Sequence, residues 1–239
     1  MILCLETATP VCSVALCDRT GVISARESHE NRSHARQLTL FIEELLNEKG
    51  IRPAELDAVA ISKGPGSYTG LRIGVSVAKG LAYGASVPLI GIDTTRSMFN
   101  GMIDSANEKY GTDSSTLFCP MIDAKRMEVY YSLFDASGKI IKGISAEVIN
   151  EGSFNEIPES VKMVFFGDGA RKCLNVTGHE NSFFDTDFVI SASFMQKTVI
   201  EEFDAGHFED VAYFEPFYLK DFITTIQRKN RLSGNPLMN

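Results

Sequence analysis

The chain has 239 residues, of which 44% are hydrophobic and 23% charged, and its formal net charge is −8. These values are typical of a folded globular protein and exclude a disordered or collagen-like chain. The length suits one large domain or two small ones. The negative charge argues against a protein that holds nucleic acid by itself, because neutralising phosphates takes clustered lysine and arginine.

Cysteine usage and the apolar stretches favour a cytoplasmic protein. The number of cysteines, five, is odd and no Cys-x-x-Cys pair occurs, so we expect buried, reduced thiols rather than a disulfide framework or a zinc site. The chain opens on a strand-like segment without the regions of a signal peptide, and none is expected. No stretch reaches the ~18 consecutive apolar residues of a membrane span, so no membrane segment is expected.

Three strands are expected at the start of the chain, followed by a helix. The strands are Ile2–Glu6, Val11–Cys17 and Gly21–Ser28. The helix is predicted from a cap at Ser33 to about Lys49, with Gly50 as its end. Its core stripe has apolar residues three and four apart, namely Ala35, Leu38, Phe41, Ile42, Leu45 and Leu46. Leu40 lies off this stripe, which predicts a second apolar contact.

A strand, a glycine-rich loop, a helix and a second strand come next. These elements are the strand Asp57–Ser62, the loop Lys63–Gly70, a helix to about Gly84 and the strand Pro88–Ile92. Their order is typical of a βαβ unit with parallel strands and a right-handed crossover. A further helix fits Thr95–Tyr110, and the polar stretch 111–115 is the expected break between two lobes.

The second half of the chain repeats the pattern of the first. Adding 117 to the residue number carries Glu6 to Asp123, Leu16 to Leu133, Asp18 to Asp135, Gly21 to Gly138 and Ile23 to Ile140. Five matches in one register predict a duplicated β-β-β-α-β-α unit. We therefore expect an α/β fold with an N-terminal lobe at 1–112, a C-terminal lobe at 113–221 and a polar tail at 222–239.

Two such lobes resemble the superfamily of actin, hexokinase and the Hsp70 ATPase (the ASKHA fold), with a mixed sheet flanked by helices in each lobe. The resemblance implies an ATP cleft between the lobes, where acidic side chains organise a metal ion. Glu6 and Asp123 are the candidates for that cleft, although acidic residues at strand ends also form turns. An ATP-dependent kinase or phosphohydrolase is therefore the alternative function. Neither hairpin, 7–10 or 124–127, contains glycine, which argues against ATP hydrolysis.

The glycine-rich loop and the helix after it have two interpretations each. Gly64–Gly70 matches neither a P-loop nor a dinucleotide fingerprint, so it is either a tight turn or a helix N-terminus that faces an anion. In the helix, Gly70, Gly74 and Ala78 recur every fourth residue, and Gly80, Ala82 and Gly84 follow. Such small residues let a neighbour approach closely. That neighbour is either the sheet of the same lobe or the helix of a partner chain.

Five segments resemble the TsaB (YeaZ) family of bacterial proteins. They are ILCLETATPVCSVAL, SKGPGSYTGLRIGVSVAKGLAYG, VPLIGIDT, MIDAKRMEVYYSLF and EPFYLKD, which run from Met1 to about Asp221. The family is the partner of TsaD in making N6-threonylcarbamoyladenosine (t6A) beside the tRNA anticodon, and has the duplicated actin/Hsp70-like fold. TsaD carries two metal-binding histidines where this sequence has Thr94 and Met98. Because hydroxyl and thioether groups are poor ligands for such a metal, the resemblance implies a non-catalytic subunit.

The resemblance also implies partners. TsaB-type proteins pair with TsaD through the first two helices of the N-terminal lobe, form homodimers through the same face when TsaD is absent, and work with the ATPase TsaE. The expected partner-facing residues are Ala35, Leu38, Leu40, Ile42, Gly70, Arg72, Gly74, Val77, Ala78 and Leu81. No metal or cofactor is expected in this subunit, ATP or ADP belongs to the partner complex, and tRNA binds only through the complex. Residues 150–210 match the family weakly and predict no contacts.

Overall fold

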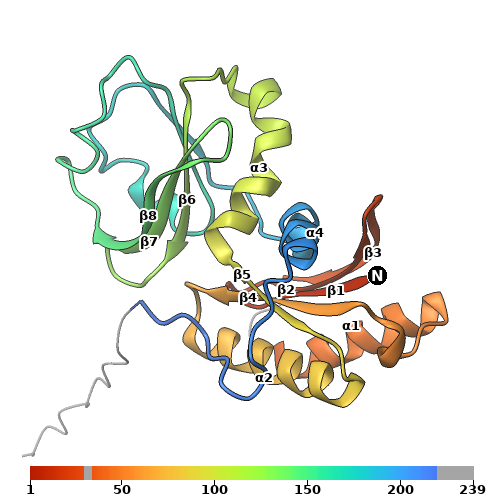
Figure 1. The fold of residues 1–239 in the computed structure, drawn as a ribbon. Helices are drawn as coiled ribbons and strands as arrows, with labels where there is room; N and C mark the ends of the chain where they lie inside the picture. Colours follow the sequence, from red (N-terminus) through yellow and green to blue (C-terminus); the bar gives the residue numbers. More distant parts are fainter. Residues whose placement is uncertain (30–33, 220–239) are drawn as a thin grey trace, which may run out of the picture.

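Three apolar segments at the start of the chain form an antiparallel ladder, and two later segments extend it into a mixed sheet (Figure 1). The computed structural model describes residues 1–29 and 34–219. The sheet has the order β3-β2-β1-β4-β5, with β1 (Ile2–Glu6), β2 (Cys12–Asp18), β3 (Gly21–Ser28), β4 (Ala58–Gly64) and β5 (Leu89–Asp93). β4 lies parallel to β1 and β5 parallel to β4, which confirms the predicted βαβ unit. All of β1 is buried, as is typical of a strand whose sheet is covered on both faces.

A second sheet repeats this order in the other lobe. Its strands are β6 (Leu117–Asp123), β7 (Glu128–Asp135), β8 (Ile140–Val148), β9 (Met163–Phe166) and β10 (Ser182–Asp185), in the order β8-β7-β6-β9-β10. The repeated Asp-x-x-Gly turns also match: Asp18 accepts hydrogen bonds from the backbone N–H groups that follow it, and Asp135 does the same. Gly21 and Gly138 take positive φ angles of 144° and 84° in these turns. The predicted two-lobed α/β architecture is confirmed.

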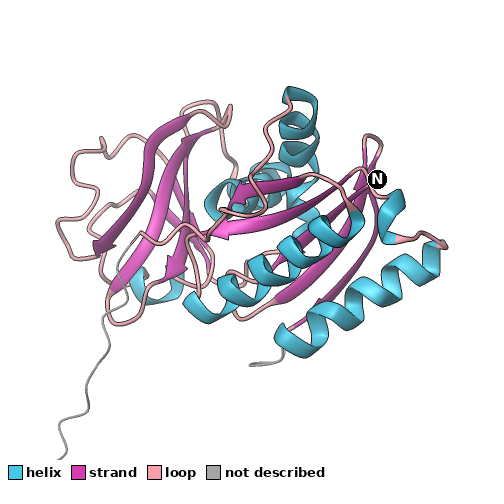
Figure 2. Ribbon diagram, turned by 60° about the horizontal axis from the view of Figure 1, so that its bottom comes forward, coloured by secondary structure: helices cyan, strands magenta, loops and turns pink. Residues whose placement is uncertain are grey.

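The helices of the repeat are only partly duplicated. In the first lobe α1 (His34–Lys49) and α2 (Tyr68–Ala85) lie side by side across one face of the sheet (Figure 2). The second lobe has turns at 150–161 in place of the first helix and a short 3-10 helix, Ala170–Cys173, in place of the second. The prediction of a fully duplicated unit is therefore wrong for these helices. The physical reason is that 150–161 contains Gly152 and Pro158 and lacks an apolar stripe.

Two helices cross between the lobes. α3 (Thr94–Tyr110) comes from the first half of the chain, yet it packs on the second sheet. α4 (Gln196–Ala205) and the 3-10 helix before it come from the second half and cover the open face of the first sheet (Figure 1). A boundary at 112/113 therefore separates the two sheets but not the helices that cover them. This exchange joins the lobes through two hydrophobic cores.

The last described segment also returns to the first lobe. The Glu209 N–H donates to the Leu89 carbonyl, and the Phe217 N–H donates to the carbonyl of Lys63. The Lys79 ammonium donates to the carbonyls of Ala212 and Phe214 at 3.1 and 2.8 Å, which holds this segment along α2. Ser33, the predicted cap of α1, and the predicted tail 222–239 lie outside the described residues. Within residues 1–29 and 34–219, no helix is long and apolar enough to cross a membrane.

Candidate functional site

The glycine-rich loop packs closely against the β1–β2 hairpin. A Cβ atom on Gly66, Gly70 or Gly74 would overlap the backbone of Ala8, the carbonyl of Thr7 or the hydroxyl of Thr7, respectively. The Ser67 N–H also donates to the Ala8 carbonyl at 2.6 Å. The glycines therefore let the loop and the first turns of α2 lie directly on the β1–β2 hairpin. Of the two interpretations of the loop, the tight turn is the one that these contacts support.

A matched pair of substitutions in α2 tests this packing. Gly74→Ala is expected to lower the free energy of unfolding by about 1–3 kcal/mol, because its methyl group would overlap Thr7 and lie 2.9 Å from Ile61 Cδ1. Gly80→Ala is expected to raise it by about 0.5–1 kcal/mol, because no atom of the described residues lies within 4 Å of the added Cβ and alanine favours the helix. Urea unfolding measures both changes in the free energy of unfolding. Stabilisation by both substitutions would show that Gly74 is not packed as described.

A cleft of about 820 Å³ lies between the lobes, beside this loop. It is lined by the β1–β2 hairpin, the starts of α1 and α2, and the turn after β6, and its acidic residues are Asp123 and Asp168. Asp123 accepts hydrogen bonds from the Lys172 ammonium at 2.5 Å and from the Lys125 N–H at 2.8 Å. Burial opposes its charge, but these partners outweigh burial and lower its pKa. The Asp123 carboxylate is thus ionised and already paired with a cation.

Glu6, the other predicted cleft residue, lies in the interior. Its side chain is fully buried and accepts hydrogen bonds from the Ala8 N–H at 2.6 Å and from the Ser62 hydroxyl. Burial raises its pKa to about 7, although these hydrogen bonds act in the opposite direction. The hairpin at 7–10 follows Glu6 directly, and it is this hairpin that lines the cleft. The prediction that Glu6 and Asp123 face a common cleft is therefore wrong for Glu6.

The outer surface of α1 and α2 carries only half of the residues expected to face a partner. Ala35, Leu40 and Arg72 are exposed, and Val77 and Leu81 are half-buried. Leu38, Ile42, Gly70, Gly74 and Ala78 are buried against the first sheet or the β1–β2 hairpin, so the expectation that they face a partner is wrong. The spacing of small and apolar residues correctly identified a stripe on each helix. It could not show that the chain's own sheet covers that stripe.

Gly80 and Gly84 occupy the opposite side of α2. Both are exposed, and a Cβ atom on either would meet no heavy atom of residues 1–29 and 34–219 within 4 Å. A glycine inside a helix costs up to about 1 kcal/mol relative to alanine. No contact with the described residues requires glycine at either position. The signal was present in the sequence, because Gly80 and Gly84 come two residues after Ala78 and Ala82 and therefore fall on the other side of the helix. Together with Leu40, which is 44% exposed, they define what we call the outer α1–α2 face.

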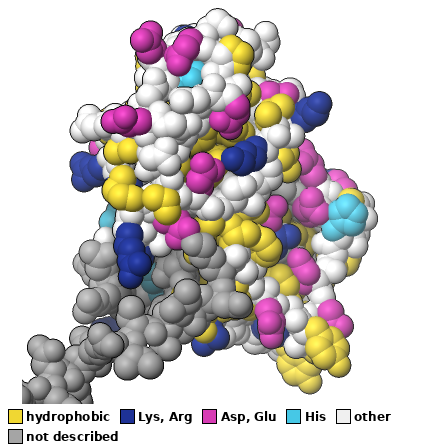
Figure 3. Space-filling model, turned by 90° about the vertical axis from the view of Figure 1, so that its left-hand side faces the viewer, with side chains coloured by type: hydrophobic (Ala, Val, Ile, Leu, Met, Phe, Trp, Pro, Cys, Tyr) yellow, Lys and Arg dark blue, Asp and Glu magenta, His cyan; other side chains and the backbone are white. Residues whose placement is uncertain are grey.

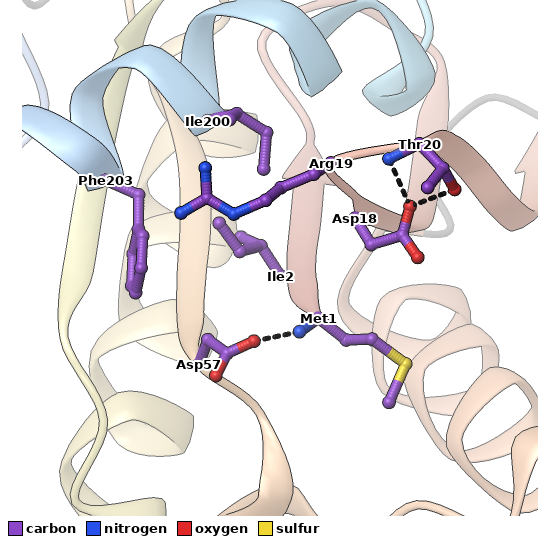
Figure 4. Close-up of a pocket in the computed structure, with 8 residues that line it drawn as sticks. All are labelled: Met1, Ile2, Asp18, Arg19, Thr20, Asp57, Ile200 and Phe203. Atoms are coloured by element: carbon purple, nitrogen blue, oxygen red, sulfur yellow. Dashed lines mark hydrogen bonds and ion pairs between the residues drawn. The ribbon is translucent and has the colours of Figure 1, made fainter.

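A small pocket of about 250 Å³ lies where α4 meets the start of β1 and the end of β2 (Figure 4). Its charged groups have partners: the amino group of Met1 pairs with Asp57, and the Arg19 guanidinium pairs with both carboxylate oxygens of Asp204 on α4. In Figure 4 the Arg19 side chain extends between Ile200 and Phe203. The Arg19–Asp204 ion pair therefore joins α4 to the first lobe. The charged groups of the pocket are satisfied within the chain.

Acidic side chains are spread over the face of the molecule seen in Figure 3, with hydrophobic ones exposed among them. α1 contributes Glu43, Glu44 and Glu48, all exposed, of which Glu44 and Glu48 approach Arg26 of β3. This distribution agrees with the net charge of −8. A polyanion such as RNA meets an unfavourable field over such a surface.

Comparison with known proteins identifies the family. The family described as "TsaD: tRNA N6-adenosine threonylcarbamoyltransferase" matches residues 22–213. The chain belongs to this family. Among its relatives are proteins named "tRNA threonylcarbamoyladenosine biosynthesis protein TsaB" from Escherichia coli K12, 35% identical over 131 residues, and from Haemophilus influenzae, 37% identical over 131 residues. These matches cover 55% of this chain and 53% and 52% of the relatives, so the chain spans about half the length of the curated relatives it matches.

A solved structure confirms the fold. "YeaZ from Pseudomonas aeruginosa" superposes with a TM-score of 0.77 at 21% identity, over 91% of this chain and 99% of that one. The relatives named TsaB confirm the predicted resemblance to the TsaB (YeaZ) family, and the solved structure confirms the fold.

The start of α3 is where the resemblance implies that TsaD carries its metal-binding histidines. Thr94 and Met98 stand here, and both are buried. Met98 packs into the core of the second lobe, and its methyl group lies against Gly167. Residues 1–29 and 34–219 contain no group of three His, Cys, Asp or Glu side chains placed to hold a metal ion. The residues present at the start of α3 therefore do not fit a metal ion.

Proposed function

We propose that this chain is a non-catalytic subunit that binds a TsaD-type threonylcarbamoyltransferase and supports its formation of t6A in tRNA. The start of α3 carries the proposal: the resemblance to TsaD places metal-binding histidines there, and this chain has buried Thr94 and Met98. The relatives named as TsaB biosynthesis proteins support the pathway. An acyl transfer assisted by a metal needs ligands that these two side chains do not supply.

The outer α1–α2 face is the proposed binding surface for the TsaD-type protein. Gly80 and Gly84 give α2 a flat strip on which a partner helix can approach closely, and Leu40 supplies exposed apolar area on α1. Burying this strip would compensate the cost of two glycines in the helix. The same face is proposed to form homodimers when the partner is absent, with TsaE as the third member of the machinery.

Association measured by light scattering tests the proposal. Mixing this chain with the TsaD-type protein of the same organism is expected to give a stable heterodimer with a dissociation constant in the micromolar range or below. The isolated chain is expected to bind tRNA weakly, with a steep dependence on salt, because its surface is acidic. Absence of a heterodimer at tens of micromolar, or nanomolar tRNA binding by the isolated chain at physiological salt, would contradict the proposal.

A further inference from the structure

A groove of about 420 Å³ lies between the lobes at the carboxyl ends of β4 and β5. The first lobe lines it with Lys63 of β4 and Asp93 of β5, and the second lobe lines it with residues of β7 and β8. Thr95 and Arg96 line it from the first turn of α3. The groove shares no described lining residue with the cleft beside the glycine-rich loop. In α/β sheets, ligands commonly bind at the carboxyl ends of parallel strands, beside the start of the following helix.

The Arg96 guanidinium has more donors than acceptors in this groove. A guanidinium carries five N–H donors. In the described part of the chain, the acceptor bonded to it is the Gly138 carbonyl at 2.7 Å, and no carboxylate oxygen lies within 4 Å. One face of the guanidinium is covered by the ring of Phe134, whose centre is 4.5 Å away. Burial lowers the pKa of Arg96, although Asp93 and Glu201 act in the opposite direction. The N–H edge of this cation therefore lacks the anion that such burial calls for.

Two buried hydroxyl groups lie beside Arg96. The side-chain oxygens of Thr95 and Ser132 are 3.0 Å apart, and both residues are only 1% exposed and line the groove. A hydrogen bond between two hydroxyls uses one of their two protons, and neither side chain makes another hydrogen bond in the described part of the chain. Thr95 and Arg96 are consecutive, and they contact Ser132 and Phe134, which are two residues apart on β7. The spare hydroxyl proton and the guanidinium edge therefore lie at the same part of the groove.

The rest of the lining combines one ion pair with an apolar wall. Lys63 lies 3.4 Å from Asp93, so the Asp93 carboxylate is already paired. The lining thus carries two cations and one anion, a balance that a single negative charge neutralises. The apolar wall consists of Phe134, Ile140, Ile144 and Phe217. A few polar groups that converge in a mostly apolar groove of this size are typical of a binding site for a small molecule.

We propose that this groove binds a small organic acid that has one carboxylate and an apolar body. The Arg96 guanidinium donates to the carboxylate oxygens, and the spare hydroxyl of the Thr95–Ser132 pair donates to one of them. The apolar body packs against Ile140 and Ile144. A ligand held in this way contacts both lobes and stabilises the folded chain. The site goes beyond the proposed subunit role, because none of its residues belongs to the outer α1–α2 face.

A methyl NMR titration of the full chain tests the proposal, with phenylacetate as the probe. The methyl signals of Ile140 and Ile144 are expected to shift saturably, with a dissociation constant of about 1 mM or below. The signal of Ile200, which lines the small pocket at α4, is expected to stay unchanged. If Ile140 and Ile144 show no saturable shift up to tens of millimolar, or if Ile200 shifts equally, the proposal is overturned.

Two comparison ligands separate the role of the carboxylate from that of the apolar body. Phenylacetamide has the same shape without the charge, and it is expected to bind at least about 10-fold more weakly because it loses charge-assisted hydrogen bonds. Inorganic phosphate has the charge without the apolar body, and it is also expected to bind at least about 10-fold more weakly because it buries none of the apolar wall. Binding of either ligand as tight as that of phenylacetate would show that the assigned chemistry is wrong.

A matched pair of substitutions on β8 locates the site. Ile144→Glu places a carboxylate in the groove and is expected to weaken phenylacetate binding at least about 10-fold, as measured at Ile140, because like charges repel. Ile141→Glu is the control, since Ile141 is 51% exposed on the same strand and is not part of the groove lining. Equal affinities of these two variants would show that phenylacetate binds elsewhere.

Arg96→Gln tests the carboxylate contact itself. The substitution removes the cation and is expected to weaken phenylacetate binding at least about 10-fold, while phenylacetamide binding changes little. Thermal melting checks that the variant is folded, and the β8 pair does not depend on this check. A folded Arg96→Gln variant that binds phenylacetate as tightly as the native chain would overturn the proposal.

Discussion

Replacing Gly80 by arginine is expected to weaken association with the TsaD-type protein at least about 100-fold while leaving the fold intact. In the part of the chain that the structure describes, no atom lies within 4 Å of a Cβ at this position, and arginine is a better helix former than glycine. The isolated variant should therefore melt at the same or a higher temperature. In the complex the same side chain would hold two helices apart and place an unpaired charge in the centre of the interface. Isothermal titration and thermal melting measure the two effects separately.

Asn107→Arg is the matched control for Gly80→Arg. Asn107 is exposed on α3, outside the outer α1–α2 face, and the substitution adds the same charge to a helix. The Asn107→Arg variant is expected to bind the partner with the same affinity as the native chain. If Gly80→Arg binds as tightly as Asn107→Arg, the outer α1–α2 face is not the binding surface.

Replacing Glu6 by glutamine is expected to change the free energy of unfolding by an amount that depends on pH. The change at pH 8 is expected to be more stabilising than the change at pH 4 by up to about 3 kcal/mol. The pKa of Glu6 is about 7 in the folded chain against 4.5 as its ordinary value. Below pH 4.5 the carboxyl is protonated in both states. Between pH 4.5 and 7 only the unfolded state releases the proton, so the native chain loses stability as pH rises. Glutamine keeps the shape of the side chain and does not titrate.

Urea unfolding of both chains across pH 4–8 isolates this contribution, because every other titrating group is common to the two. The amide of glutamine can accept from the Ala8 N–H and donate to the Ser62 hydroxyl, so the local hydrogen bonds are retained. A difference in stability that stays constant over this pH range would show that Glu6 is ionised in the folded chain with an ordinary pKa.

Local sequence patterns predicted the two sheets well. The apolar segments around the Asp18 and Asp135 turns have the same spacing, and both fold into the same antiparallel ladder. The glycine loop after β4 marked the start of α2 to within a few residues. These features depend on contacts close in sequence, which periodicity and turn chemistry report directly.

The failures concern contacts between elements distant in sequence. Gly74 and Gly80 are both glycines of α2, but one lies on the β1–β2 hairpin and the other faces open space. Glu6 and Asp123 are equivalent in the repeat, yet Glu6 is buried and Asp123 lines the cleft. The crossing of α3 and α4 between the lobes has no local signal, because each helix has an apolar stripe that fits either sheet.

Formation of t6A in a reconstituted system tests the central claim most directly. The measurement combines tRNA, threonylcarbamoyl-adenylate, the TsaD-type protein and TsaE, with or without this chain, and quantifies t6A by mass spectrometry of the digested tRNA. The proposed subunit role predicts t6A only when the TsaD-type protein and this chain are both present. Modified tRNA formed by this chain alone, or undiminished activity of the other components without it, would contradict that role.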